Sequence, residues 1–386
     1  MPDSSTRAPR IESVDILRGV IMIVMALDHT RDYFGDAAAS PTNLATASAA
    51  LFATRWITNI CAPVFFLLTG TGAYLSLRRR TVGELSRFLA TRGLWMIFLE
   101  LTFARFLWQF NVDYHVTILT VLWAFGWSML VLAALVHLPT RVVAGVGVAM
   151  IALHNLLDPI RTGIIGKLHS PSMFLASPDH VVFSAYPIIP WIGVTALGFG
   201  LGALFNLSLE SRRSRLRRIG WSAIAAFVVL RGINVYGDPS RWSPQPTALY
   251  TVLSFLNTTK YPPSLLFLLM TLGPAMLILA AVDGRTPSAL RPALIIGKVP
   301  FFYYLVHILV LHVLAVIASA ARFGTIAPMF DSPTLDKYPI TQLPGWPASL
   351  PVVYLVWVTV VLILYPLCRW YAALRQRSGA WWLSYL

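Results

Sequence analysis

Arg18 and His29 combine a permanent positive charge with an imidazole that can accept a proton near neutral pH. Ten mostly apolar residues lie between them, so His29 is eleven positions after Arg18. In a helix, eleven residues return to nearly the same face and advance about 16 Å along the axis. Met22 and Met25 fall on the same stripe. The spacing therefore predicts one helical face with a guanidinium at one end and a candidate general base deeper toward the other.

Two carboxylates near His29 are candidates to orient its ring. Asp32 lies about one turn beyond His29, and Asp28 directly precedes it. A carboxylate on one ring nitrogen selects the tautomer of a catalytic imidazole. Asp15 lies three residues before Arg18 and can pair with it on one face. The competing interpretation is an arginine that only fixes membrane orientation, with a His–Asp cap at the helix end.

A second polar cluster lies in the apolar run 297–321. Tyr304 and His307 share a helical face there, whereas His312 lies five positions beyond His307 on another face. This spacing argues against a two-histidine metal helix, and no other metal motif is present, so we expect no metal. Both histidines have the competing interpretation of an ordinary hydrogen bond between helices.

Glu100 lies near the middle of the run 88–108, where an isolated charge costs several kcal/mol. Arg105 is five positions further and points to a different face. We therefore expect the partner of Glu100 on another helix and interpret the residue as half of a structural ion pair.

Two polar segments precede apolar runs. Arg55 and Asn59 lie in the first, and Lys260 and Tyr261 lie in the second, directly before two prolines. Proline in the first turn is a usual helix start. The polar groups before it are expected to line an outward vestibule, and an anchor at the lipid headgroups is the alternative.

Composition indicates that lipid surrounds most of these elements. Of the 386 residues, 57% are hydrophobic and only 12% are charged, against about 25% in soluble domains. A spanning helix needs about 20 mostly apolar residues. The sequence predicts an all-α polytopic membrane protein with about ten transmembrane helices. The ten runs are 14–33, 55–77, 88–108, 116–137, 140–157, 185–207, 218–236, 262–282, 297–321 and 349–373.

The net charge of +14 is gathered in short basic loops, which are typical of the cytoplasmic side of a membrane and argue against nucleic-acid binding. The alternate loops are longer and richer in Pro, Ser, Asp and Tyr. We predict that both termini are cytoplasmic, with residues 1–13 as a cytoplasmic segment of a single integral-membrane domain, 1–386. The basic loops are 78–87, 138–140, 208–217, 283–296 and the tail from Trp370.

Taken in order along the chain, these motifs resemble a known family. The R-x10-H pair Arg18 and His29 is similar to that of the family-three membrane acyltransferases. The strings around Asp28–Phe34, Arg55–Phe65, Asn257–Ser264 and Gly297–His307 resemble bacterial relatives of heparan-α-glucosaminide N-acetyltransferase. The matches extend over most of the chain.

The resemblance implies an acyltransferase that moves an acyl group, usually acetyl, from cytoplasmic acyl-CoA to a sugar or glycan on the far side of a bacterial inner membrane. It implies His29 as the base, although a positioning role for His29 is the alternative. A homodimer is one option for the assembly. A transporter or flippase with an intramembrane polar relay is the alternative function.

The implied roles group the candidate residues into three sets. The catalytic set is His29, Asp32, Asp28, His307 and Tyr304, with Tyr304, His307, Asn59 or Arg55 as oxyanion stabilisers. The acetyl-CoA phosphates are expected on Arg18, Arg78, Arg79, Arg80 and Arg92. The acceptor is expected on Arg55, Asn59, Lys260 and Tyr261. Direct transfer is preferred to an acetyl-histidine intermediate, because no catalytic Ser or Cys motif is present.

Overall fold

The computed structural model describes residues 10–378 and 383, so the predicted cytoplasmic segment is described only from residue 10 onward. The protein is mostly helical, with 69% helix and 4% strand. In the part of the chain that the structure describes, six helices are long and apolar enough to cross a membrane. These features confirm a helical protein with candidate membrane spans. The number ten and the orientation stay predictions.

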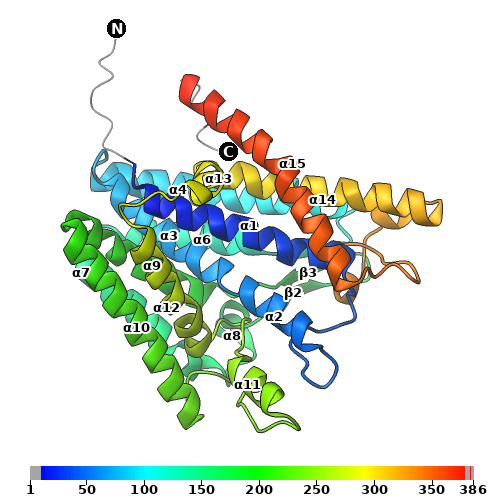
Figure 1. The fold of residues 1–386 in the computed structure, drawn as a ribbon, viewed down its shortest axis with the longest axis horizontal. Helices are drawn as coiled ribbons and strands as arrows, with labels where there is room; N and C mark the ends of the chain where they lie inside the picture. Colours follow the sequence, from blue (N-terminus) through cyan, green and yellow to red (C-terminus); the bar gives the residue numbers. More distant parts are fainter. Residues whose placement is uncertain (1–9, 379–382, 384–386) are drawn as a thin grey trace.

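Fifteen α-helices are described within these residues, and a three-stranded sheet joins them (Figure 1). The helices are α1 (Glu12–Phe34), α2 (Ala49–Thr58), α3 (Cys61–Ser76), α4 (Val82–Leu99), α5 (Arg105–Gln109), α6 (Val121–Leu135), α7 (Thr140–Leu153), α8 (Gly163–His169), α9 (Ile188–Gly202), α10 (Leu209–Ile233), α11 (Ala248–Leu256), α12 (Leu265–Val282), α13 (Arg291–Gly297), α14 (Pro300–Phe323) and α15 (Leu350–Arg377). The strands are β1 (Val116–Leu119), β2 (Ser172–Ala176) and β3 (Val181–Ser184). β3 is central, parallel to β1 and antiparallel to β2.

Several predicted runs differ from the helices observed. The run 116–137 begins as strand β1, because its first four residues pair with β3 and α6 starts only at Val121. The run 55–77 is divided into α2 and α3, and the run 297–321 begins in α13 and continues as α14 from Pro300. Pro300 cannot donate a backbone hydrogen bond, which suits the first position of a helix.

α1 is the central element of the bundle, in contact with α2, α3, α12, α13, α14 and α15 (Figure 1). Its approach to α13 depends on two glycines. A Cβ at Gly19 would collide with the backbone oxygen of Ala293, and one at Gly297 would collide with that of Asp15. Small residues permit such close packing between helices in lipid. The contact fixes α1 beside the start of α14.

The two ends of the described helical bundle meet. Arg10, just before α1, and Arg375, near the end of α15, both donate to the carbonyl of Lys298 between α13 and α14. In Figure 1 the start of α1 and the end of α15 accordingly lie on the same side of the molecule. Both segments therefore lie beside the connection between α13 and α14.

Candidate active site

Helices α1 and α14 bring two histidines into direct contact. Nδ1 of His29 lies 2.6 Å from Nε2 of His307, and the two rings are stacked at 4.9 Å with an interplanar angle of 18°. His307 is fully buried, whereas His29 is only partly buried. The residues are 278 positions apart in the chain. The structure thus joins the two histidines that sequence reasoning selected separately.

The hydrogen-bond partners determine the tautomers of the neutral histidine pair. Nδ1 of His307 lies 3.0 Å from the carbonyl oxygen of Tyr303, which can only accept. Nδ1 of His307 therefore carries the proton, and its Nε2 accepts from Nδ1–H of His29. In a neutral imidazole the remaining nitrogen is then unprotonated. This arrangement leaves Nε2 of His29 with a free lone pair, as a general base requires.

The carboxylates expected beside His29 contact cations instead. Asp28 accepts from Arg55 at 2.6 Å and lies 3.1 Å from Arg31 and 3.7 Å from Lys260. Asp32 pairs with Arg31 at 2.9 Å. We predicted that Asp32 would bind a ring nitrogen of His29. This prediction is wrong for Nδ1, which contacts His307 instead. By contrast, the predicted pairing of Arg18 with Asp15 is confirmed at 2.9 Å.

A cavity of about 530 Å³, here the histidine cavity, opens beside His29. Tyr338 lies in its wall, and burial raises the pKa of this phenol well above its ordinary value, so it stays neutral. The wall is otherwise rich in polar and aromatic groups. It includes Asp28, His29, Arg31, Asp32, Arg55, Trp108, Thr120, Tyr186, Tyr261, Tyr304 and Tyr338.

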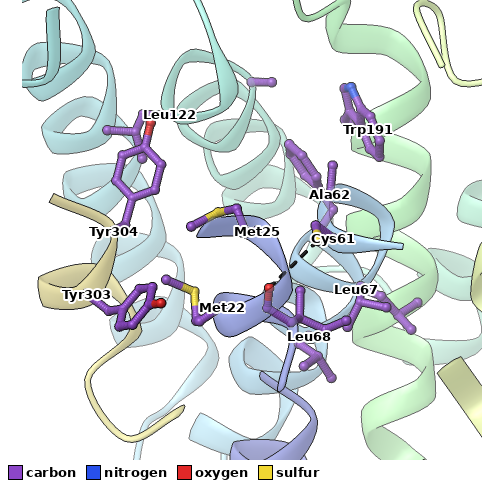
Figure 2. Packing of buried hydrophobic residues seen from close by; sticks show 14 of the residues in the cluster. Met22, Met25, Cys61, Ala62, Leu67, Leu68, Leu122, Trp191, Tyr303 and Tyr304 are labelled. Atoms are coloured by element: carbon purple, nitrogen blue, oxygen red, sulfur yellow. Dashed lines mark hydrogen bonds between the residues drawn. The ribbon is translucent and has the colours of Figure 1, made fainter. Parts of the chain in front are cut away.

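Two further cavities follow α1 away from the histidines. The methionine cavity, of about 200 Å³, has mostly apolar walls formed by Met22, Met25 and their neighbours. It shares Tyr304 and Val121 with the histidine cavity. Figure 2 shows Met22 and Met25 near Tyr303 and Tyr304 of α14. The residues of the predicted stripe on α1 therefore line neighbouring cavities.

The arginine cavity, of about 250 Å³, is the next neighbour along α1 and is lined by Arg10. Arg18 lines both it and the methionine cavity. Five arginines surround it, namely Arg10, Arg18, Arg78, Arg79 and Arg80. Arg92 lies further in, where it lines the methionine cavity. Each arginine predicted to bind phosphate thus lines the arginine cavity or the methionine cavity. These residues are Arg18, Arg78, Arg79, Arg80 and Arg92.

A polar vestibule of about 520 Å³ lies on the other side of the histidine cavity and shares Arg31, Arg55 and Tyr261 with it. Asn59 and Lys260 also line it. Oδ1 of Asn59 and Nη1 of Arg31 are buried without a hydrogen-bond partner in the described residues. All four residues expected at the acceptor therefore meet at this vestibule.

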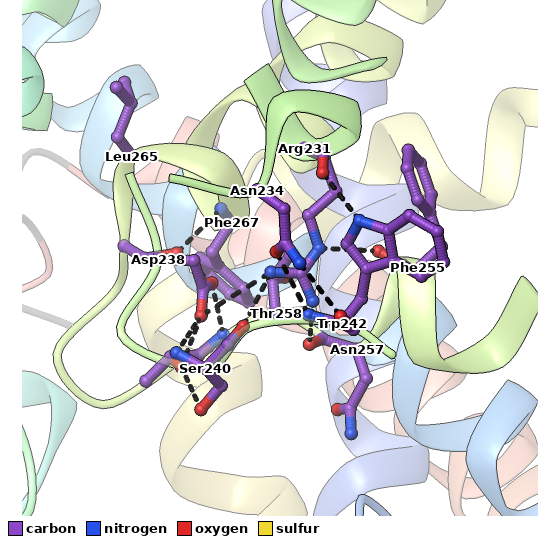
Figure 3. A network of polar contacts seen from close by, with 12 residues as sticks. Arg231, Asn234, Asp238, Ser240, Trp242, Phe255, Asn257, Thr258, Leu265 and Phe267 are labelled. Carbon is purple, nitrogen blue, oxygen red and sulfur yellow. Dashed lines mark hydrogen bonds and ion pairs between the residues drawn. The ribbon is translucent and has the colours of Figure 1, made fainter. Parts of the chain in front are cut away.

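A buried arginine that the sequence analysis did not select holds one wall of the vestibule. Arg231 is 1% exposed and donates to the carbonyls of Ser240, Ser254, Phe255 and Asn257 at 2.7 to 3.1 Å. Figure 3 shows this network joining the end of α10 to the segments on either side of α11. The network positions the chain that leads into Lys260 and Tyr261.

The ion pair predicted for Glu100 is not found among the described residues, because its carboxylate binds backbone N–H groups instead. Its carboxylate accepts from the backbone N–H of Thr120 at 2.5 Å and of Leu122 at 3.2 Å. These groups lie at the start of α6, where backbone donors lack partners within the helix. Glu100 begins a five-residue π-helical turn ending at Ala104. The carboxylate therefore fixes the start of α6 against the helix that carries Trp108.

Sequence reasoning missed Trp108, Thr120 and Tyr338 as cavity residues. The edge of the Trp108 ring contacts His29 with ring centroids 5.0 Å apart. Its place depends on the π-helical turn, which shifts the helical register and leaves no plain sequence signal. Thr120 lies in the run 116–137, which we interpreted as helical throughout. Tyr338 lies in a long loop between two predicted helices.

A comparison with protein families matches residues 10–237 to the family described as heparan-alpha-glucosaminide N-acetyltransferase, catalytic. The match covers more than half of the chain. It includes Arg18, His29, Arg92 and Trp108, whereas His307 lies beyond it. A search of curated proteins finds no match.

Proposed function

Because this chain belongs to the heparan-α-glucosaminide N-acetyltransferase family, we propose that it is a membrane acetyltransferase using acetyl-CoA. The acetyl group passes from the CoA thioester to a hydroxyl or amine of a sugar or glycan on the opposite side of the membrane. The observation that carries this proposal is the row of neighbouring cavities along α1, with arginines lining one end and His29 lining the other.

The chemistry of these cavities matches the parts of acetyl-CoA in order. Guanidinium groups recognise phosphates through charge-assisted hydrogen bonds, which suits the arginine cavity. The mostly apolar methionine cavity suits the slender pantetheine arm. Tyr304 stands where this cavity meets the histidine cavity, so the thioester is expected beside it.

The histidine pair supplies the base for direct transfer. Nε2 of His29 takes the proton of the acceptor, and His307 holds the ring in the required tautomer. The acceptor enters from the polar vestibule, where Asn59, Lys260 and Tyr261 offer hydrogen-bonding groups to a sugar. Asp28 and Asp32 keep the surrounding cations in place. Donor and acceptor thus approach His29 from opposite ends of the path.

The proposed topology has about ten spans with both termini in the cytoplasm of a bacterial cell, and residues 1–386 form one integral-membrane domain. The arginine cavity then faces cytoplasmic acetyl-CoA. The contacts of Arg10 and Arg375 with Lys298 support this topology, because they bring the start of α1 and the end of α15 to the same place, and Arg10 lines the arginine cavity. A homodimer in the inner membrane is compatible with this arrangement.

We expect Arg18→Ala to weaken the binding of acetyl-CoA by about tenfold or more, since a hydrogen bond to a charged group contributes about 1.5–3 kcal/mol. Binding is measured by titration calorimetry of the purified protein. Arg217→Ala is the matched control, because Arg217 is an exposed arginine on α10 that lines none of these cavities.

Comparing acetyl-CoA with acetyl-dephospho-CoA tests where the 3′-phosphate binds. Acetyl-dephospho-CoA lacks the 3′-phosphate, so its affinity should fall below that of acetyl-CoA in the wild-type protein. Arg79→Ala should reduce this difference if the arginine cavity holds the phosphate. If acetyl-CoA does not bind at millimolar concentration, the proposed donor is wrong. That result would favour the alternative function, a transporter.

A further inference from the structure

Three buried hydrogen-bond donors gather beside His29 without a well-formed hydrogen bond to any described residue. They are the indole Nε1 of Trp108, the hydroxyl of Thr120 and the hydroxyl of Tyr304. Each of these polar atoms is buried and makes no hydrogen bond of good geometry with a described residue, yet all three side chains line the histidine cavity. Buried polar groups are normally paired, so three in one wall require an explanation.

These donors come from three separate elements and meet where the donor path ends. Trp108 is on α5, Thr120 directly precedes α6, and Tyr304 is on α14. The side chains of Trp108 and Thr120 approach the Tyr304 hydroxyl as weak hydrogen-bond partners, so the three polar groups converge. Tyr304 also lines the methionine cavity. The group of donors therefore lies at the junction that a thioester would reach.

The same junction lies next to the proposed base. The ring centroid of His29 is 5.0 Å from that of Trp108 and 6.5 Å from that of Tyr304, both in edge-on contacts. A reacting carbonyl at the junction would thus have the base on one side and the donors on another. This is the relation that acyl transfer requires.

Surrounding contacts hold these side chains in place. Glu100 accepts from the backbone N–H groups of Thr120 and Leu122 and also interacts with the Thr120 side chain, so it fixes the start of α6. Tyr33 stacks on Trp108 at 5.8 Å and donates to its carbonyl oxygen at 2.9 Å. These contacts fix both side chains before any substrate arrives.

We propose that Trp108, Thr120 and Tyr304 form the oxyanion site of the acetyl transfer. This inference rests on the proposed function. Indole N–H can only donate, and both hydroxyls can donate, so the set suits an oxygen that gains negative charge. Rigid donors that meet such an oxygen in a dry site stabilise the transition state without further reorganisation.

In the step itself, the acceptor oxygen or nitrogen forms a bond to the carbonyl carbon of the thioester. The carbonyl π electrons move to oxygen, where the three donors hold the charge, and His29 takes the acceptor proton. The carbonyl then re-forms, the C–S bond breaks, and the CoA sulfur receives the proton from His29. The products are the acetylated acceptor and free CoA.

Three near-isosteric variants test the site, namely Trp108→Phe, Thr120→Val and Tyr304→Phe. Each removes one donor and keeps most of the side-chain volume. We expect kcat for CoA release from acetyl-CoA to fall by about 10²-fold in each, with acetyl-CoA affinity unchanged. Losses in the double variants should be smaller than the product of the single losses, because the donors act on one oxygen.

Trp191→Phe and Trp123→Phe are the matched controls. Both indole N–H groups are also buried without a partner in the described residues, but neither side chain lines the histidine cavity. Both controls should retain wild-type kcat. Melting temperatures of all variants show whether a loss comes from unfolding.

The outcomes separate this inference from the function on which it rests. If the wild-type protein does not consume acetyl-CoA, the proposed function fails. If the wild-type protein turns over and the three variants keep its kcat, only the oxyanion site is overturned. The same holds if the tryptophan controls lose as much activity as Trp108→Phe, because the effect would then be one of packing.

Discussion

Replacing His29 by glutamine is expected to lower kcat for acetyl transfer by about 10³–10⁴-fold while acetyl-CoA still binds. Glutamine retains hydrogen-bonding groups but cannot accept the proton of the acceptor, and general-base catalysis contributes about 10²–10⁴-fold. The arginine cavity shares no lining residue with the histidine cavity, so acetyl-CoA binding should persist. CoA release is followed with a thiol reagent, and binding by calorimetry.

His169→Gln is the matched control for this variant. His169 is also fully buried and has a histidine neighbour, with its Nε2 3.2 Å from Nδ1 of His154, but it lies outside the cavities along α1. It should retain wild-type kcat. Turnover by His29→Gln at the wild-type rate would show that His29 is at most a positioning residue.

Replacing His307 by phenylalanine is expected to lower kcat by about 10²–10⁴-fold, although His307 is fully buried. Phenylalanine retains the ring stack but offers no acceptor to Nδ1–H of His29. The imidazole can then adopt the tautomer in which Nε2 carries the proton and cannot act as base. In serine proteases, losing the group that fixes the tautomer costs about 10⁴-fold.

A conservative variant distinguishes this positioning role from packing. His307→Gln can present its amide oxygen to Nδ1–H of His29 and should recover part of the activity that the phenylalanine variant loses. If the two variants lose activity equally while both stay folded, the tautomer argument is wrong. Acetyl-CoA affinity should match that of the wild-type protein in both, since His307 lines none of the described cavities along α1.

Helical periodicity was sufficient to predict which side chains of α1 share the face that lines the cavities. The 3.6-residue repeat placed Arg18, Met22, Met25 and His29 on one face, and these residues line the connected cavities. The polar segment at Lys260 was recognisable because polar groups before an apolar run are unusual. Both inferences concern neighbouring residues within one segment, where backbone geometry alone determines which side chains share a face.

The contacts between distant segments could not be predicted in this way. The pairing of His29 with His307 depends on how α1 and α14 pack, and their separation of 278 residues leaves no local signal. The start of the run 116–137 was misassigned because a short apolar strand and a helix look alike in composition. Glu100 was interpreted as half of an ion pair because the uncapped start of α6, its actual partner, became visible only in three dimensions.

The most direct test of the account follows a labelled acetyl group across a sealed membrane. Purified protein is reconstituted into vesicles loaded with glucosamine as the probe acceptor, and acetyl-CoA labelled in its acetyl group is added outside. The account predicts labelled N-acetylglucosamine inside the vesicles with wild-type protein and none with His29→Gln. Labelled product that forms only when glucosamine and acetyl-CoA share one side would contradict it, as would transfer that does not depend on His29.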